Sequence, residues 1–113
     1  MQQWRICMTN TLTDHLIGKH VLIRSDMSGV HFGTLVHVDG AGVRLADSRR
    51  LWEWQVANNA GISLSEIALA GIEHSGSKIS ASLPDIVVFG VCEIIEAHGL
   101  CIATIQGAAT HQP

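Results

Sequence analysis

The chain has 113 residues, which is the length of one domain and too short for a multi-domain enzyme. Hydrophobic residues make up 47% and charged residues only 15%, against about 25% in average soluble domains, so a disordered chain is not expected. The formal net charge of −3 argues against general affinity for duplex nucleic acid but leaves room for a basic site for one small anion. So few charges on a small domain indicate that oligomerisation covers part of its apolar surface.

The cysteines and the ends of the chain bear on its location. Cys7, Cys92 and Cys101 form no CxxC pair and are predicted to be buried or half-buried free thiols in a reducing compartment. No run of eighteen apolar residues predicts a membrane span, and residues 1–5 do not resemble the start of a secretory signal. We therefore expect a cytoplasmic protein that contacts no membrane.

The first half of the chain predicts a run of short strands. A short helix or turn is expected at residues 13–18, where no strand pattern is present. The expected strands then alternate with turns, of which Asp39-Gly40-Ala41-Gly42 favours a hairpin. They cover residues 20–25, 30–39, 43–45 and 50–54.

The second half predicts one helix between strands. Ser63 and Glu66 have the spacing of a capping box, and Gly71 follows the last apolar turn, so a helix is expected over residues 63–70. After a segment around residues 78–82, the apolar residues predict one long strand and a last strand. These cover residues 85–96 and 100–105. The long strand is apolar on both faces, which is typical of a central strand or of one packed on another subunit. The prediction is one α+β domain over residues 1–113, mostly antiparallel β with one short capped helix.

Arginine and tryptophan are concentrated in one candidate binding strand. Arg49 and Arg50 directly precede Trp52 and Trp54, so alternation puts Arg50 on the same face as both indoles. Arginine binds phosphate with two hydrogen bonds and tryptophan stacks on a base, so this face suits a nucleotide. The alternative is that both indoles are core residues and that Arg50 pairs with an acid such as Asp47.

A second candidate anion site is the turn that follows the first strand. It offers a guanidinium, hydroxyl groups and turn N–H groups over Arg24-Ser25-Asp26-Met27-Ser28-Gly29. The alternative is an ordinary β-turn in which Arg24 bridges to Asp26. The seven histidines show neither HxH nor HExxH spacing, and no catalytic motif is present, so we expect no metal, no cofactor and no catalytic residue.

Three segments of the chain carry a family resemblance. They are SGVHFGTL at 28–35, SRRLWEW at 48–54 and SLSEIALAGI at 63–72, and the similarity extends over about residues 21–96. They resemble the first type of phage anti-Thoeris protein, a "sponge" that sequesters a cyclic ADP-ribose signal in the cytoplasm of the host bacterium. This resemblance implies a small β-rich domain that forms dimers and higher oligomers, commonly hexamers, and does not cleave its ligand.

The resemblance also implies two sites between subunits. The pocket for glycocyclic ADP-ribose would contain Arg49, Arg50, Trp52, Trp54, Lys78, Ile79 and Asp85. Ile79 and Asp85 depart from the family, which has an aromatic and a polar side chain in that region. The turn from Arg24 to His31 would hold the cyclic tri- and dinucleotides of the CBASS pathway.

Two other functions fit the same residues. A structural or adaptor protein of a virion would use the apolar domain for assembly and would bind no nucleotide. A small nucleotide hydrolase would turn its ligand over and would depend on Cys92, Cys101 or a histidine.

Overall fold

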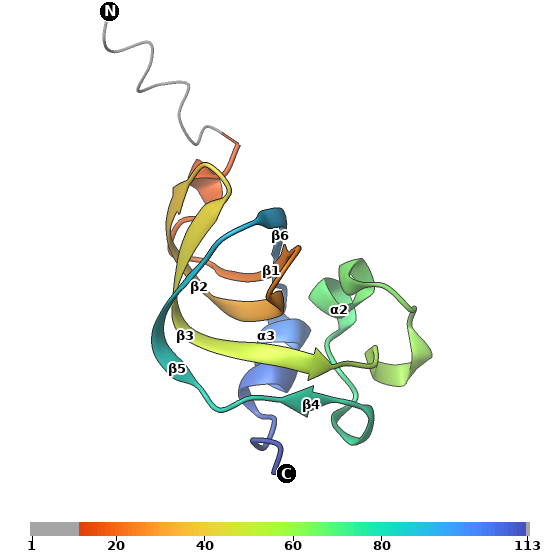
Figure 1. Cartoon of the computed structure of the whole chain (residues 1–113). Coiled ribbons are helices and arrows are strands. Elements are labelled where there is room, and N and C mark those ends of the chain that lie inside the picture. The colour runs from red at the N-terminus through yellow and green to blue at the C-terminus, as the bar shows by residue number, and fades with distance from the viewer. Residues whose placement is uncertain (1–11, 113) are drawn as a thin grey trace, which may run out of the picture.

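The computed structural model describes residues 12–112, and its strands and helices are labelled in Figure 1. Cys7 and the first five residues, on which two of the expectations above depend, lie outside this range. The strands are β1 His20–Ser25, β2 Gly29–Asp39, β3 Gly42–Glu53, β4 Lys78–Ile79, β5 Leu83–Val88 and β6 Val91–Glu96. The helices are α2 Leu64–Ala70 and α3 Gly99–Gln106, with short 3-10 turns η1 Asp14–Leu16, η2 Ala57–Asn59 and η3 His74–Gly76.

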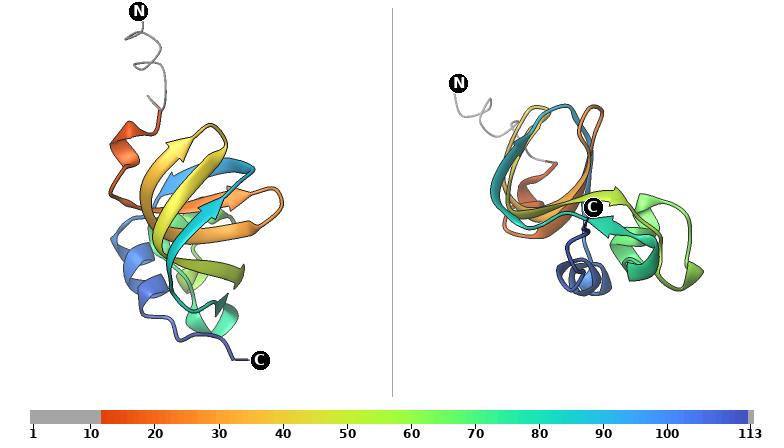
Figure 2. Two further views of the ribbon diagram at one scale, coloured as in Figure 1. Left: turned by 60° about the vertical axis from the view of Figure 1, so that its left-hand side comes forward. Right: turned by 60° about the horizontal axis from the view of Figure 1, so that its bottom comes forward.

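The strands form one antiparallel sheet. Its order is β4-β3-β2-β1-β6, and β5 pairs with β3 on the same side as β4. The sheet curls into an open-sided barrel, and α2 and α3 lie together outside it (Figure 2). The expected α+β domain with mostly antiparallel strands is therefore confirmed, with two helices where one was expected.

Each face of the sheet has its own hydrophobic core because neighbouring strand residues point to opposite faces. Val21 and Ile23 of β1 pack in the cluster inside the barrel, with Leu35 and Leu45 of the next two strands. Leu22, between them, packs in the outer cluster that the two helices cover. Strands with two buried faces explain why so much of the sequence is apolar.

The expected break between strands at residues 47–49 is wrong, because β3 continues through it as a β-bulge. The register with β2 shifts between the pairs Phe32↔Arg49 and Thr34↔Ala46, and Asp47 there has a φ of 50°. Gly33 lies opposite, and a Cβ on it would be only 3.0 Å from the Ala46 carbonyl oxygen. A glycine therefore lets the two backbones approach closely at the bulge.

The single strand predicted over residues 85–96 is also wrong, because it is two strands. Gly90, with a φ of 71°, turns the chain between β5 and β6. The first of these strands pairs with β3 and the second with β1, towards opposite ends of the strand order. The residues apolar on both faces are explained within one chain. Ile94 packs against the cluster inside the barrel, whereas Ile95 packs against the cluster under the helices.

The two helices differ in how well the sequence predicts them. The capping box of α2 is present, with the Ser63 N–H donating to the Glu66 carboxylate at 3.2 Å. By contrast, residues 100–105 form most of α3 and not the predicted strand. Cys101 and Ile105, four residues apart, bury one face of this helix. A short run that is apolar almost throughout has no clear period, so its pattern does not separate helix from strand.

Candidate functional site

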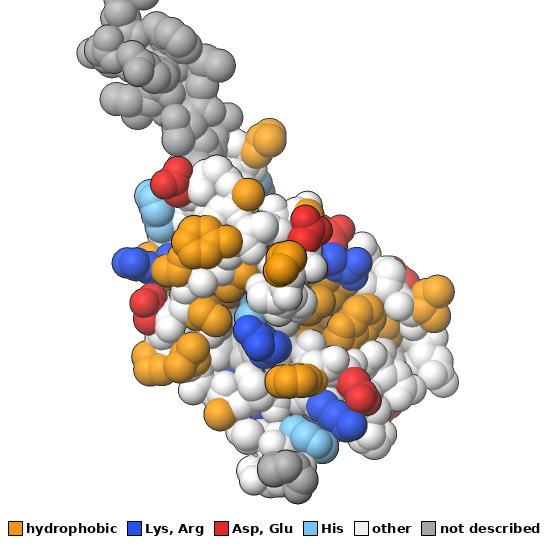
Figure 3. All heavy atoms as spheres, viewed as in Figure 1, with side chains coloured by type: hydrophobic (Ala, Val, Ile, Leu, Met, Phe, Trp, Pro, Cys, Tyr) orange, Lys and Arg blue, Asp and Glu red, His pale blue; other side chains and the backbone are white. Residues whose placement is uncertain are grey.

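An exposed tryptophan separates two hollows on one face of the molecule. Trp52, near the end of β3, has 71% of its surface exposed, which is unusual for so large an apolar side chain. Arg50 lines a hollow of about 350 Å³ on one side of Trp52, and Lys78 lines a hollow of about 480 Å³ on the other. We call them the Arg50 hollow and the Lys78 hollow, and together the Trp52 site. Figure 3 shows basic and apolar side chains next to one another on a face of the molecule.

The Arg50 hollow contains a charged group without an ion pair. In the described range, Arg24 and Arg44 each pair with a carboxylate, but Arg50 does not. The alternative in which Arg50 pairs with Asp47 is therefore not what the structure shows. The Arg50 backbone N–H donates to the Ser80 hydroxyl at 2.7 Å, and the Ser80 N–H donates to the Arg50 carbonyl at 2.9 Å. These two bonds fix the strand at this point and leave the guanidinium available to a ligand.

His31 lies directly across from Arg50 in the pairing of β2 with β3 and lines the same hollow. The His31 Nε2–H donates to the Ser28 carbonyl at 3.0 Å. Burial and, second, the charge of Arg50 lower the pKa of His31 below its usual 6.5, so the ring is neutral at neutral pH. Because the imidazole is neutral, Arg50 is the positive charge among the described residues that line this hollow.

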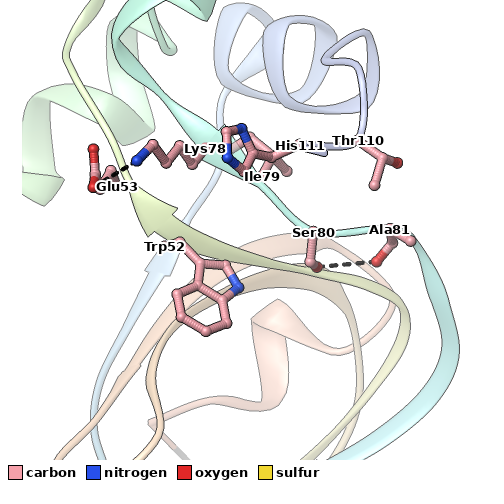
Figure 4. Close-up of a pocket in the computed structure, with 8 residues that line it drawn as sticks. All are labelled: Trp52, Glu53, Lys78, Ile79, Ser80, Ala81, Thr110 and His111. Atoms are coloured by element: carbon pink, nitrogen blue, oxygen red, sulfur yellow. Dashed lines mark hydrogen bonds and ion pairs between the residues drawn. The ribbon is translucent and has the colours of Figure 1, made fainter. Parts of the chain in front are cut away.

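Figure 4 shows the Lys78 hollow, which the C-terminal segment helps to form. Lys78 Nζ lies 3.1 Å from Glu53 Oε1, so a ligand phosphate would compete with an exposed carboxylate for this ammonium. The His111 backbone N–H donates to the Ile79 carbonyl at 2.9 Å, and Thr110 pairs with Ile79 in a parallel bridge. Residues 97–113 contain no lysine or arginine, but a histidine from this segment thus reaches the site.

Of the residues predicted for the ADP-ribose pocket, Arg50, Trp52, Lys78 and Ile79 line the two hollows. Arg49 has a different place, because its guanidinium donates to three carbonyls. They belong to Ser80 at 2.8 Å, Ile105 at 2.8 Å and Ala108 at 2.7 Å. The last two carbonyls are at the end of α3, where cations are favourable. Arg49 therefore connects β3 to the end of that helix.

Two further predicted pocket residues lie away from the hollows. Trp54 follows the end of β3 and packs partly buried against the outer core. Asp85 of β5 pairs with Arg44, at 3.7 Å between Nε and Oδ1. Neither lines the Arg50 or the Lys78 hollow.

The predicted second site is a hydrogen-bonded turn. The Ser25 hydroxyl donates to the Phe89 carbonyl at 2.7 Å and accepts the N–H groups of Met27 and Ser28 at 3.4 and 3.3 Å. Arg24 pairs with Glu93 at 3.6 Å, and not with Asp26 as in the alternative. Gly29 ends the turn with a φ of 80°, and the Met27 side chain is exposed. His31 is the residue of this set that also lines the Arg50 hollow.

Other residues of the hollows were not predicted as site residues. Ser48, Ser80, Leu83 and Ile86 line the Arg50 hollow, and their residue types are common in ordinary strands. No pattern in the sequence marks His111 as a site residue. The pairing of Thr110 with Ile79, which is distant in the chain, brings it to the site. Within residues 12–112, no three His, Cys, Asp or Glu side chains gather where they could hold a metal ion. In the same range no helix has the length and apolar character to cross a membrane.

Fold and geometry together define a small α+β domain with two surface hollows beside an exposed tryptophan. Residues 18–105 match the family described as a domain of unknown function (DUF6948), and the chain belongs to that family. The match covers β1 to α3 and ends before Thr110 and His111. No curated protein and no solved structure matches this chain.

Proposed function

We propose that the chain is a non-catalytic binding protein that sequesters a phosphorylated nucleotide at the Trp52 site. The observation that carries the proposal is the exposed Trp52 indole between two cations. Arg50 has no ion pair among residues 12–112, and Lys78 pairs with the exposed Glu53. An indole stacks on a base with about 1–3 kcal/mol, and a guanidinium binds phosphate with two hydrogen bonds. Cations on both sides of one stacking ring suit a ligand with a base and two phosphates.

The resemblance to anti-Thoeris sponges narrows the proposed ligand to glycocyclic ADP-ribose, held intact in the host cytoplasm. A sponge needs about nanomolar affinity, roughly −12 kcal/mol, to outcompete effectors. Two surface hollows on one chain bury too little of a ligand for that affinity. A second copy that covers the Trp52 site would supply the rest, so an oligomer, from dimer to hexamer, is part of the proposal.

Cyclic tri- and dinucleotides are a second proposed ligand class, assigned by resemblance to the turn from Arg24 to His31. Because Arg24 is paired with Glu93, an anion there would have to displace a carboxylate. Ser25 uses its hydroxyl within the turn. The turn differs in this respect from the Trp52 site, where Arg50 has no ion pair among residues 12–112.

Calorimetry with a ligand panel tests the main proposal. The panel is glycocyclic ADP-ribose, linear ADP-ribose, a cyclic trinucleotide, a cyclic dinucleotide and AMP. We expect the wild type and Arg44→Ala to bind glycocyclic ADP-ribose alike, and Arg50→Ala to bind it much more weakly. Arg44 is the matched control because it is also an arginine of β3 but pairs with Asp85 outside the site. Equal affinity of all three proteins would contradict the site.

Recovery of the ligand distinguishes sequestration from catalysis. Heat release of the bound ligand should return it chemically intact, as mass spectrometry would show. A hydrolysed product would identify the chain as an enzyme and overturn the proposal.

An exposed apolar patch favours a role in assembly as the second candidate. Phe89, in the turn between β5 and β6, is 74% exposed and lines a hollow of about 300 Å³ with Val36 and Val87. Patches of this kind mark protein contacts. Failure of every nucleotide to bind, together with association with virions, would support this candidate over the sponge.

A further inference from the structure

His31 and Arg50 point to the inner face of the barrel and share one hollow. They lie directly opposite each other in the pairing of β2 with β3, and His31 lies opposite Ile23 in the pairing of β2 with β1. Residues directly opposite each other in antiparallel strands point to the same face of the sheet. Ile23 packs in the cluster inside the barrel, so the imidazole and the guanidinium point to that face too. An anion that enters the Arg50 hollow therefore approaches both groups.

The His31 imidazole is enclosed and has one nitrogen that can take a proton. Only 1% of the surface of His31 is exposed, and its Nε2 lies 3.0 Å from the Ser28 carbonyl oxygen. Because a carbonyl can only accept a hydrogen bond, Nε2 carries the hydrogen in the neutral ring and Nδ1 does not. Protonation at Nδ1 therefore keeps the bond to Ser28 and adds a positive charge beside Arg50.

Arg50 is the charged side chain that acts on His31. Burial and, second, the charge of Arg50 hold the pKa of His31 below its usual value. Nearby, Arg24 and Glu93 pair with each other on exposed side chains, and Asp26 is exposed in the turn after β1, so solvent screens these charges. The other described residues that line the hollow are uncharged: Ser48, Trp52, Ser80, Ala81, Ser82, Leu83 and Ile86.

We propose that an anion bound in the Arg50 hollow makes His31 take up a proton, so that the site binds phosphate more tightly as the pH falls. This inference rests on the proposed function, because a phosphate group must bind at Arg50. The negative charge of the phosphate offsets the charge of Arg50 and favours the protonated imidazole. Since the coupling between two bound species is reciprocal, a proton on His31 strengthens phosphate binding by the same factor.

NMR titration of the His31 imidazole in the full chain, with and without sulfate, tests the proposal. Sulfate is the probe because it is doubly charged, as a phosphate group can be, and does not itself titrate near neutral pH. Sodium chloride keeps the ionic strength equal, because salt alone screens charges. We expect sulfate to raise the pKa of His31, and its affinity to increase about fivefold or more from about pH 8 to about pH 5. The side-chain signals of Arg50 measure the affinity, which separates this hollow from the Lys78 hollow, where His111 also titrates.

Two histidine variants of β2 separate this coupling from general effects of pH. His31→Gln retains an amide N–H that can donate to the Ser28 carbonyl but does not titrate, so its affinity for sulfate should lose the pH dependence. His37→Gln is the matched control, because His37 belongs to the same strand but lines a different hollow, and should behave as the wild type does. The wild-type titration needs no variant and decides the question if His31→Gln does not fold.

The outcomes separate this inference from the proposed function. Saturable binding of sulfate at Arg50 with no change in the pKa of His31 would overturn the coupling and leave the phosphate site in place. Equal pH dependence in the wild type and His31→Gln would do the same. If sulfate has no saturable effect on the Arg50 signals at either pH, the hollow is not an anion site, and the proposed function fails together with this inference.

Discussion

Arg49 and Arg50 are neighbours in the chain, but their side chains serve opposite faces of β3. Arg49 donates to the carbonyls of Ile105 and Ala108 at the end of α3, whereas Arg50 lines the hollow beside Trp52. Alternation along a strand separates the two guanidinium groups in this way. One arginine therefore stabilises the fold, and the other is available to a ligand.

Replacing Arg49 should destabilise the protein. Arg49→Ala leaves the carbonyls of Ser80, Ile105 and Ala108 without their donor and removes a buried side chain, so we expect a loss of roughly 3 kcal/mol or more. Urea unfolding monitored by circular dichroism measures the loss. Arg50→Ala is the control and should change the free energy of unfolding by less than about 1 kcal/mol. Equal stability of the two variants would contradict the role of Arg49.

Replacing Trp52 should affect binding and not stability. Trp52→Ala removes a mostly exposed indole, so the free energy of unfolding should change by less than about 0.5 kcal/mol. Loss of one stacked base should weaken nucleotide binding roughly 5- to 150-fold. Calorimetry with glycocyclic ADP-ribose measures this, and Ile62→Ala, also exposed, is the control. Unchanged affinity in Trp52→Ala would place the ligand elsewhere.

His31 should make stability depend on pH. Because burial and Arg50 lower the pKa of His31, the unfolded chain binds its proton at higher pH than the folded chain. This contribution to stability is therefore complete above about pH 6.5 and is lost as the pH falls through the lower pKa of the folded state.

Removing the charge of Arg50 isolates the contribution of His31 to the pH dependence of stability. Urea unfolding at about pH 7.5 and about pH 5 should show a smaller loss of stability on acidification in Arg50→Gln than in Arg44→Gln. Removal of the Arg50 charge should raise the pKa of His31 towards its usual value, whereas Arg44 does not contribute to its shift. Identical losses in both variants would contradict this coupling.

Gly33 should not tolerate a side chain. A Cβ there would lie 3.0 Å from the Ala46 carbonyl oxygen and 3.3 Å from the Ser48 Cα, both in the backbone of the bulge. Gly33→Ala should cost about 1–3 kcal/mol in urea unfolding. Gly99→Ala is the control, because its Cβ meets nothing within 4 Å at the start of α3, and should be neutral or gain up to about 1 kcal/mol. A neutral Gly33→Ala would mean that the bulge can widen at no cost.

The cysteines should react very differently with a thiol reagent. Burial raises the pKa of Cys101 to about 12, whereas Cys92 is exposed, which corrects the expectation that its thiol is covered. The thiolate is the reactive species, so iodoacetamide should modify Cys92 in the folded protein and Cys101 after unfolding. Mass spectrometry of peptides identifies the sites. Rapid modification of Cys101 in the folded protein would contradict its burial and revive a catalytic role for it.

Short sequence patterns predicted some residues of the site but not those that distant parts of the chain contribute. Arg50 and Trp52 belong to one strand, so alternation alone places them on one face, and their spacing is visible in the sequence. His111 and Ser80 reach the same site through pairing with Ile79 and Arg50, which are far from them in the chain. No local pattern specifies those partners.

The sequence by itself determined the capped helix α2, the first two strands and the placement of Arg50 and Trp52 on one face of a strand. These follow from capping, alternation and turn residues, which act over a few positions. Only the tertiary structure decided that α3 is a helix, that β5 and β6 are separate strands, and that Arg49 bonds to the end of α3. Each depends on contacts between distant segments. For α3 and for β5 and β6, the reason is that an apolar run buries equally well in either conformation until its neighbours are in place. For Arg49, the accepting carbonyls lie more than fifty residues further along the chain.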